Sequence, residues 1–165
     1  MKGGALLHPE LAQALATLGH TDTILVTDAG FPIPAGAHRI DLGLRPGLVD
    51  VRDVLRVVLD QVYVEEAVFA PELKSHHPTL YREVQAIFTG SGATFGTASH
   101  ELLCSDYAPR AKFVIRSGSF EPWANFSLVA STDPFAWFAD EGVEILPAYV
   151  ERRQRIQRGD VPDLA

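Results

Sequence analysis

A short apolar run near the N-terminus does most to constrain how this chain can fold. Residues 23–27, with the sequence TILVT, are rich in β-branched side chains, and Asp28-Ala29-Gly30 breaks the run. This pattern predicts a buried β-strand that ends in a turn. His20 precedes the strand and Asp28 follows it, and a strand of about eight residues spans roughly 25 Å. The two side chains therefore cannot act as a pair within one subunit. Either they serve separate sites, or the fold or a neighbouring chain brings the start of one strand near the end of another.

Helical and strand patterns alternate along the rest of the chain. Residues 50–60 carry the clearest helical pattern, with valine and leucine on one face and charged residues on the other. We also expect helices over 9–18, 78–88 and 99–107, the last one stopped by Pro109. Strands are expected over 61–69, 112–116 and 126–130, with another between 89 and 99 and a short extended piece at 38–41. This alternation predicts one α/β domain in which helices cover a sheet.

Composition narrows the class of partner. The formal net charge of −7, without clustered Lys and Arg, argues against nucleic acid or a membrane surface as a partner. Cys104 is the only cysteine, which rules out an internal disulfide and fits a reducing cytoplasm. Pro9 and Glu10 would interrupt the apolar part of any signal peptide, so we expect neither a signal peptide nor an anchor.

The composition changes after residue 131. Residues 134–147 are aromatic and acidic, and residues 149–158 form a basic polar run. We expect a C-terminal extension over 132–165, made of an apolar hook that packs against a neighbour, a solvated helix and a loose end from Gly159.

Four separated motifs, in order along residues 1–131, carry a resemblance to a known family. They are GHTDTILVTDAGFPIP, ELKSHHPTL, Ser99-His100-Glu101 and VIRSGSFEPWAN. Together they resemble the D-ribose pyranase family, whose wider group includes the L-fucose mutarotases. The first motif is more similar to the ribose branch.

The resemblance implies a cytoplasmic isomerase that interconverts the ring forms of a free aldose without a metal or other cofactor. It implies that His20 is the acid catalyst and that the sugar is bound by Asp28, His100 and the motif Trp123-Ala124-Asn125, in which tryptophan replaces the family's tyrosine. The implied fold is a single α/β domain with a mixed sheet covered by helices. Such domains assemble into a ring-like homo-oligomer, often a decamer, with sites between subunits.

Independent chemistry asks for the same kinds of residue. Opening a hemiacetal requires one group to protonate the ring oxygen and another to take the anomeric hydroxyl proton, and imidazole suits both roles near neutral pH. An aspartate accepts hydrogen bonds from sugar hydroxyls, and an asparagine amide both donates and accepts. D-ribose is the first expected sugar, with fucose or another sugar as the alternative.

Each candidate also has a purely structural explanation. His20 could cap a helix, Asp28 could close a turn, and His100 could be an ordinary first-turn residue. The pair His76-His77 is interpreted as structural, and Cys104 as a small core side chain. A non-catalytic sugar-binding or sensing protein, or a structural oligomer, remains an alternative to the isomerase.

Overall fold

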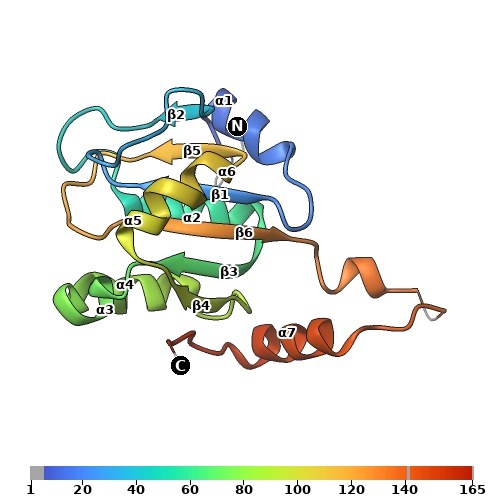
Figure 1. Cartoon of the computed structure of the whole chain (residues 1–165). Coiled ribbons are helices and arrows are strands. Elements are labelled where there is room, and N and C mark those ends of the chain that lie inside the picture. The colour runs from blue at the N-terminus through green and yellow to red at the C-terminus, as the bar shows by residue number, and fades with distance from the viewer. Residues whose placement is uncertain (1–5, 141, 165) are drawn as a thin grey trace.

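A mixed β-sheet lies at the centre of the protein (Figure 1). The computed structural model describes residues 6–140 and 142–164. Within them the strands are β1 (Thr23–Thr27), β2 (Arg39–Asp41), β3 (Tyr63–Phe69), β4 (Thr94–Thr97), β5 (Phe113–Arg116) and β6 (Phe126–Ser131), in the order β2-β5-β1-β6-β3-β4. The strand β6 is antiparallel to both β1 and β3, whereas the remaining pairs are parallel. The start of β6 therefore lies beside the end of β1, and the end of β6 lies beside the start of β1.

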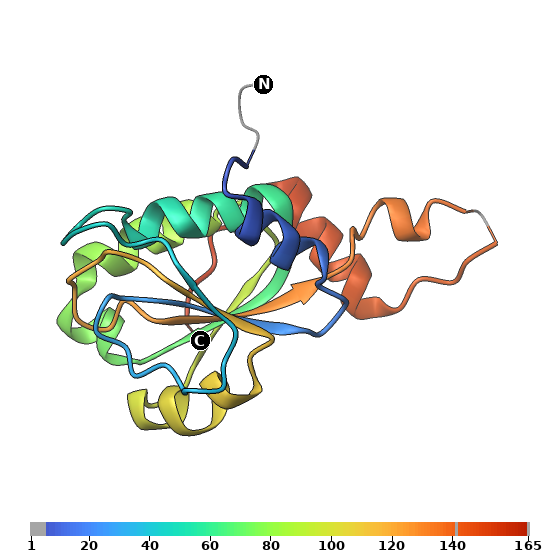
Figure 2. The same cartoon turned by 90° about the horizontal axis from the view of Figure 1, so that it is seen from above.

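Helices cover both faces of this sheet (Figure 2). One face packs against α1 (Pro9–Ala16), α2 (Val51–Gln61) and α4 (Pro78–Phe88), and the other against the segment from α5 (His100–Leu102) to α6 (Ala108–Arg110). Ile24 and Val26 of β1 face the larger core, and Leu25 between them faces the smaller one. This alternation is what a strand buried on both faces requires. The predicted α/β domain with a mixed sheet is confirmed.

The helix predicted over 50–60 forms as α2. Asp50 caps it by accepting a hydrogen bond from the backbone N–H of Arg52 at 2.8 Å. Its apolar stripe, Val51, Val54, Leu55 and Val58, is at most 1% exposed. Full burial stabilises the fold by about 1.5–3 kcal/mol for each such side chain.

The helix predicted over 99–107 does not stop before Pro109. After α5 the chain passes through a π-helical turn, Leu103–Tyr107, in which the N–H of Ala108 bonds to the carbonyl of Leu103, and it continues into α6. Pro109 falls in the first turn of α6, where a missing N–H costs little. The widened turn thus lets the helical segment continue past the proline.

A glycine in the fourth motif lets two loops meet. A Cβ on Gly118 would lie 2.4 Å from the carbonyl oxygen of Leu48, which no side chain tolerates. The adjacent Ser119 accepts a hydrogen bond from the N–H of Val51 at 2.8 Å, and its carbonyl accepts one from Ala29 at 2.9 Å. This contact ties the start of α2 to the turn after β1.

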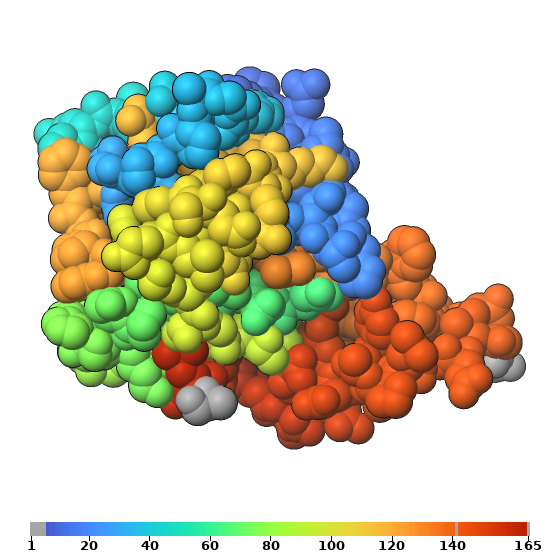
Figure 3. Space-filling model, in the orientation of Figure 1, coloured from blue at the N-terminus to red at the C-terminus, as the bar shows by residue number. Residues whose placement is uncertain are grey.

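The C-terminal extension differs from its prediction in two ways. It leaves β6 as an arm that projects from the body (Figure 3) and returns as α7 (Pro147–Arg158) along the body (Figure 1). The helix is at least partly exposed along the rest of its length, as expected, but Arg152 in its middle is only 3% exposed. The end expected to be loose is docked, because Asp163 accepts hydrogen bonds from Lys74 at 2.9 Å and from the Tyr81 hydroxyl. These contacts lower the pKa of Asp163 to about 2.

No helix in residues 6–140 and 142–164 is long and apolar enough to cross a membrane.

Candidate functional site

Asp28 and Asn125 meet where β1 ends and β6 begins. The Asn125 amide donates to Oδ2 of Asp28 at 2.7 Å, and its carbonyl oxygen accepts the backbone N–H of Asp28 at 3.0 Å. The other carboxylate oxygen of Asp28 accepts the N–H of Gly30 at 2.8 Å. Asn125 is only 2% exposed. The amide therefore fixes the orientation of the carboxylate.

Trp123 adds an aromatic ring beside this pair. Its backbone has a φ of +61°, a left-handed conformation that costs a non-glycine residue about 1–3 kcal/mol. The ring centroid lies 5.4 Å from that of His76. Strain of this kind gathers at functional sites, and the ring of this strained residue lies against an imidazole. Ala124 is fully buried in the larger core, so its side chain acts as a spacer between Trp123 and Asn125.

His100 approaches the same end of the sheet from the helical segment on the other face. Ser99 caps its helix by accepting the N–H of Leu102 at 3.2 Å. The imidazole packs edge-on against Phe31 and lies 3.7 Å from the Cys104 sulfur. The pKa of the Cys104 thiol is raised, first by burial and then by the nearby carboxylates of Glu101 and Asp28. A neutral thiol is a poor nucleophile, which agrees with the structural role expected for this cysteine.

A charged network positions the loop that faces Asp28. Arg52 binds both oxygens of Glu121, at 2.6 and 2.9 Å, and also binds Asp50 and Glu83. The hydrogen bonds from Arg52 lower the pKa of Glu121. The loop borders a hollow of about 300 Å³ that Asp28 and the exposed ring of Phe120 also line. Asp28 thus lies at the margin of a space open to a ligand.

His20 lies at the opposite end of β1. The backbone of Thr21 has a φ of +69°, and its N–H bonds to the carbonyl of Ala130 at 2.9 Å. His20 Nε2 lies 3.3 Å from Oε2 of Glu65 and 3.3 Å from the hydroxyl of Tyr149. The imidazole lines a pocket of about 310 Å³, to which Trp137 of the arm also contributes.

The structure does not bring His20 and Asp28 together within one chain. The five residues of β1 lie between them, and a strand of that length spans roughly 17 Å. The expectation that they cannot pair within a subunit is confirmed. One end of the sheet carries four of the predicted site residues, namely Asp28, His100, Trp123 and Asn125. The other end carries His20 alone among them.

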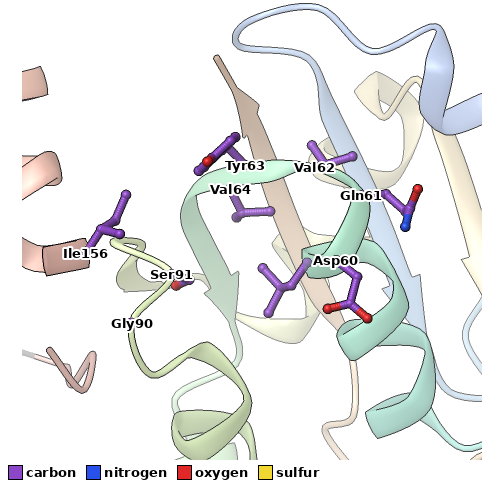
Figure 4. A pocket seen from close by; sticks show the side chains of 9 residues that line it. Asp60, Gln61, Val62, Tyr63, Val64, Gly90, Ser91 and Ile156 are labelled. Atoms are coloured by element: carbon purple, nitrogen blue, oxygen red, sulfur yellow. The ribbon is translucent and has the colours of Figure 1, made fainter. Parts of the chain in front are cut away.

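A second groove, of about 380 Å³, adjoins the His20 pocket and shares Gln61, Val62 and Tyr63 with it. Figure 4 shows Tyr63 and Val64 at the start of β3, with Ile156 of α7 across the groove. The extension therefore contributes to the walls of both hollows.

Three residues near these sites were missed or given no functional role by the sequence-based reasoning. Glu65 is the extra residue at an irregularity in the β3–β6 pairing, between Val64 and Glu66, which is a position where strands redirect side chains. Two adjacent glutamates in an apolar strand were the available signal. His76 was interpreted as structural, yet its ring lies against Trp123. Tyr149 lies in the extension, where no motif pointed to it.

No three His, Cys, Asp or Glu side chains in the described parts of the chain are placed to hold a metal ion together.

The fold and its polar groups define a small α/β protein that can bind a polyhydroxylated molecule through carboxylate, amide, imidazole and aromatic groups. Residues 1–132 match the RbsD / FucU transport protein family, and the chain belongs to that family. The resemblance to the D-ribose pyranases is thus confirmed.

Relatives of two lengths match this chain. D-ribose pyranase 1 of Streptomyces griseus subsp. griseus is 45% identical over 152 residues, which is 92% of this chain and 99% of the relative. D-ribose pyranase 2 of Rubrobacter xylanophilus is 40% identical over 153 residues, covering 93% and 97%. D-ribose pyranase of Variovorax paradoxus is 47% identical over 131 residues, covering 79% and 97%. The first two matches must therefore include part of the extension.

Among solved structures, Bacillus subtilis RbsD complexed with D-ribose is 38% identical to this chain with a TM-score of 0.74. It covers 81% of this chain and 99% of its own. The fucose mutarotase of Streptococcus pneumoniae, at 18% identity and a TM-score of 0.66, covers 77% of this chain and 94% of its own and shares the fold.

Proposed function

We propose that this protein is a D-ribose pyranase, an isomerase that interconverts the pyranose and furanose forms of free D-ribose. The observation that carries the proposal is the match to D-ribose pyranases at 40–47% identity over nearly their whole length. The similarity to an RbsD structure that holds D-ribose supports the same sugar. The proposal places the reaction in the cytoplasm, as the family resemblance implies.

In the proposed reaction His20 moves the protons. Imidazolium gives a proton to the ring oxygen as the C1–O bond breaks, and the anomeric hydroxyl gives its proton to a water molecule, which leaves the open-chain aldehyde. The ring then closes through a different hydroxyl, whose proton goes to the neutral imidazole while the aldehyde oxygen takes a proton from water, so nothing is oxidised and no group is transferred. Asp28, His100 and Asn125 bind the hydroxyls, and Trp123 lies against a C–H face of the sugar.

The active form in this proposal is a homo-oligomer in a ring, with ten subunits as the expected number. The support is the position of His20 and Asp28 at opposite ends of β1. A site that needs both is completed when the His20 end of one subunit meets the Asp28 end of its neighbour. Multi-angle light scattering gives the subunit number, and a monomer with full activity would contradict this arrangement.

Proton NMR tests the activity directly. Saturation of a pyranose anomeric signal of D-ribose transfers to the furanose signals at a rate that the wild-type protein should raise. His20→Ala should lower that rate by about 10²-fold or more, the usual contribution of a general acid–base group. His38→Ala is the matched control, because His38 is an exposed histidine paired with Glu10 and away from both clusters. Binding without faster exchange would indicate a sugar-binding or sensing protein, and faster exchange with L-fucose alone would indicate a fucose mutarotase.

A further inference from the structure

The extension brings a phenol and a buried cation to the surroundings of His20. The Tyr149 hydroxyl lies 3.3 Å from His20 Nε2, on the same nitrogen that faces Glu65. The two ring centroids are 6.1 Å apart. Both oxygens therefore converge on one atom of the imidazole.

The position of Tyr149 is braced from within the extension. Its ring lies 4.8 Å from that of Phe138, centroid to centroid. Arg153 donates to the carbonyls of Pro134, Phe135 and Phe138, and its guanidinium lies over two of their rings. The arm and α7 thus hold each other, and Tyr149 projects from this braced unit toward His20.

Arg152 joins the extension to the body beside Glu65. It donates to the Ser131 hydroxyl and to the Thr132 carbonyl at 2.8 Å, and its Nη1 lies 3.8 Å from Oε2 of Glu65. Its Nε is buried and has no hydrogen-bond partner among the described residues. A buried guanidinium with an unsatisfied nitrogen is a costly way to attach a helix. The position of Arg152 beside Glu65 indicates a role besides attaching α7, namely to hold the Glu65 carboxylate.

The contacts determine which imidazole nitrogen carries a proton. A carboxylate only accepts hydrogen bonds, so Nε2 of His20 must be protonated to bond to Glu65. The phenol oxygen of Tyr149 then acts as a second acceptor for the same N–H. Nδ1 of His20 makes no hydrogen bond within residues 6–140 and 142–164, which leaves it to exchange protons with a substrate.

We propose that Tyr149 and Arg152 are positioning residues for His20: Tyr149 fixes the imidazole through Nε2, and Arg152 holds Glu65 as the acceptor of the Nε2 proton. This inference rests on the proposed role of His20. It assigns to the extension a part in the reaction, in addition to packing. The groups that face His20 are Glu65 from β3, Tyr149 from α7, and the pocket residues Tyr63 and Asp133, with Arg152 acting through Glu65.

Tyr149→Phe removes the hydroxyl and keeps the ring that packs on Phe138. The expected result is a three- to tenfold lower kcat for ribose ring exchange with an unchanged KM. Tyr107→Phe is the matched control, since Tyr107 is a partly buried tyrosine on the π-helical turn. Equal kcat values for Tyr149→Phe and the wild type would overturn the role of Tyr149.

Arg152→Met and Glu65→Gln separate positioning from anchoring. Loss of the cation leaves the full charge of Glu65 on His20, so the pH of half-maximal activity should rise by about half a unit to one unit, whereas Glu65→Gln should lower it. Arg155→Met is the matched control, because Arg155 also anchors α7, through the Gly92 carbonyl at 3.1 Å, without contacting Glu65. Arg152→Lys, which keeps the charge, should restore the profile. The same pH profile for the methionine variants of both arginines would overturn the role of Arg152.

Nitrogen-15 NMR of the histidine side chains provides a readout that does not depend on the activity. The neutral His20 ring should show a protonated Nε2 in the wild type and a mixture of tautomers in Glu65→Gln. A wild-type His20 with the proton on Nδ1 would overturn the positioning inference even if ribose exchange is fast. Slow exchange with the expected tautomer would instead count against the proposed function.

Discussion

The bond between Asp28 and Asn125 can be tested by a double-mutant cycle. Asn125→Ala removes the amide donor to a carboxylate, worth about 2 kcal/mol, and leaves the N–H of Asp28 without its acceptor, for about 1 kcal/mol more. The expected loss of unfolding free energy is therefore about 3 kcal/mol. Asp28→Ala keeps its backbone bond to Asn125 but loses the carboxylate contacts, for about 2–3 kcal/mol.

The cycle isolates the side-chain contact. Because the 2.7 Å bond is missing in either single variant, the double variant should lose about 2 kcal/mol less than the sum of the two. Urea unfolding followed by circular dichroism measures each free energy, at one fixed protein concentration because association would add to stability. Gln85→Ala is the matched control and should cost about 1 kcal/mol, because within residues 6–140 and 142–164 the side-chain amide bonds only to the Pro162 carbonyl, at 2.9 Å. A coupling energy below about 0.5 kcal/mol would refute the view that the amide orients the carboxylate.

Three other perturbations probe the extension and the loops. The pKa of Asp163 is lowered to about 2, so its contacts stabilise the docked residues 159–164 above about pH 4 and are lost as the pH falls toward 2. Loss of these contacts should raise backbone hydrogen exchange in 159–164 across that pH range. Asp163→Asn, which lacks the carboxyl group, should not show this rise. Gly92→Ala should release α7 and lower the free energy of unfolding by about 2–3 kcal/mol, because the φ of Gly92 is +76° and a Cβ would lie 2.5 Å from Ile156. Faster tryptic cleavage within α7 is the measurement. Gly118→Ala should cost about 3 kcal/mol or more in thermal unfolding, since its Cβ would meet a backbone oxygen at 2.4 Å, and an unchanged Tm would contradict the close approach of the two loops.

Much of the local structure was predictable because its causes are local. The apolar stripe of α2 and the buried run of β1 each depend on residues within one short segment. The direction of β6 was not predictable in this way, since it depends on pairing with β1 and with β3, whose paired residues lie more than fifty positions earlier in the sequence. The prediction that Pro109 stops the helix was wrong, because the π-helical turn before it changes which N–H groups are needed.

The candidate site was predictable to the extent that motifs record it. The resemblance named Asp28 and Asn125, and the sheet adds that they bond directly, although they are 97 positions apart. The burial of Arg152 was not predictable from its charge, because Arg152 lies in a run of polar residues that predicts an exposed helix. No motif pointed to Tyr149, since its contact with His20 depends on the return of α7 to the body.

The direction of β6 also determines where a C-terminal extension leaves the sheet. Because β6 is antiparallel to β1, the chain leaves the sheet beside His20 and away from Asp28. The residues that directly follow β6 therefore emerge next to His20, although the chain ends farther away, where Asp163 contacts Lys74 and Tyr81. If β6 were parallel to β1, the extension would instead leave the sheet beside Asp28. The direction of this one strand thus determines that the extension begins beside His20.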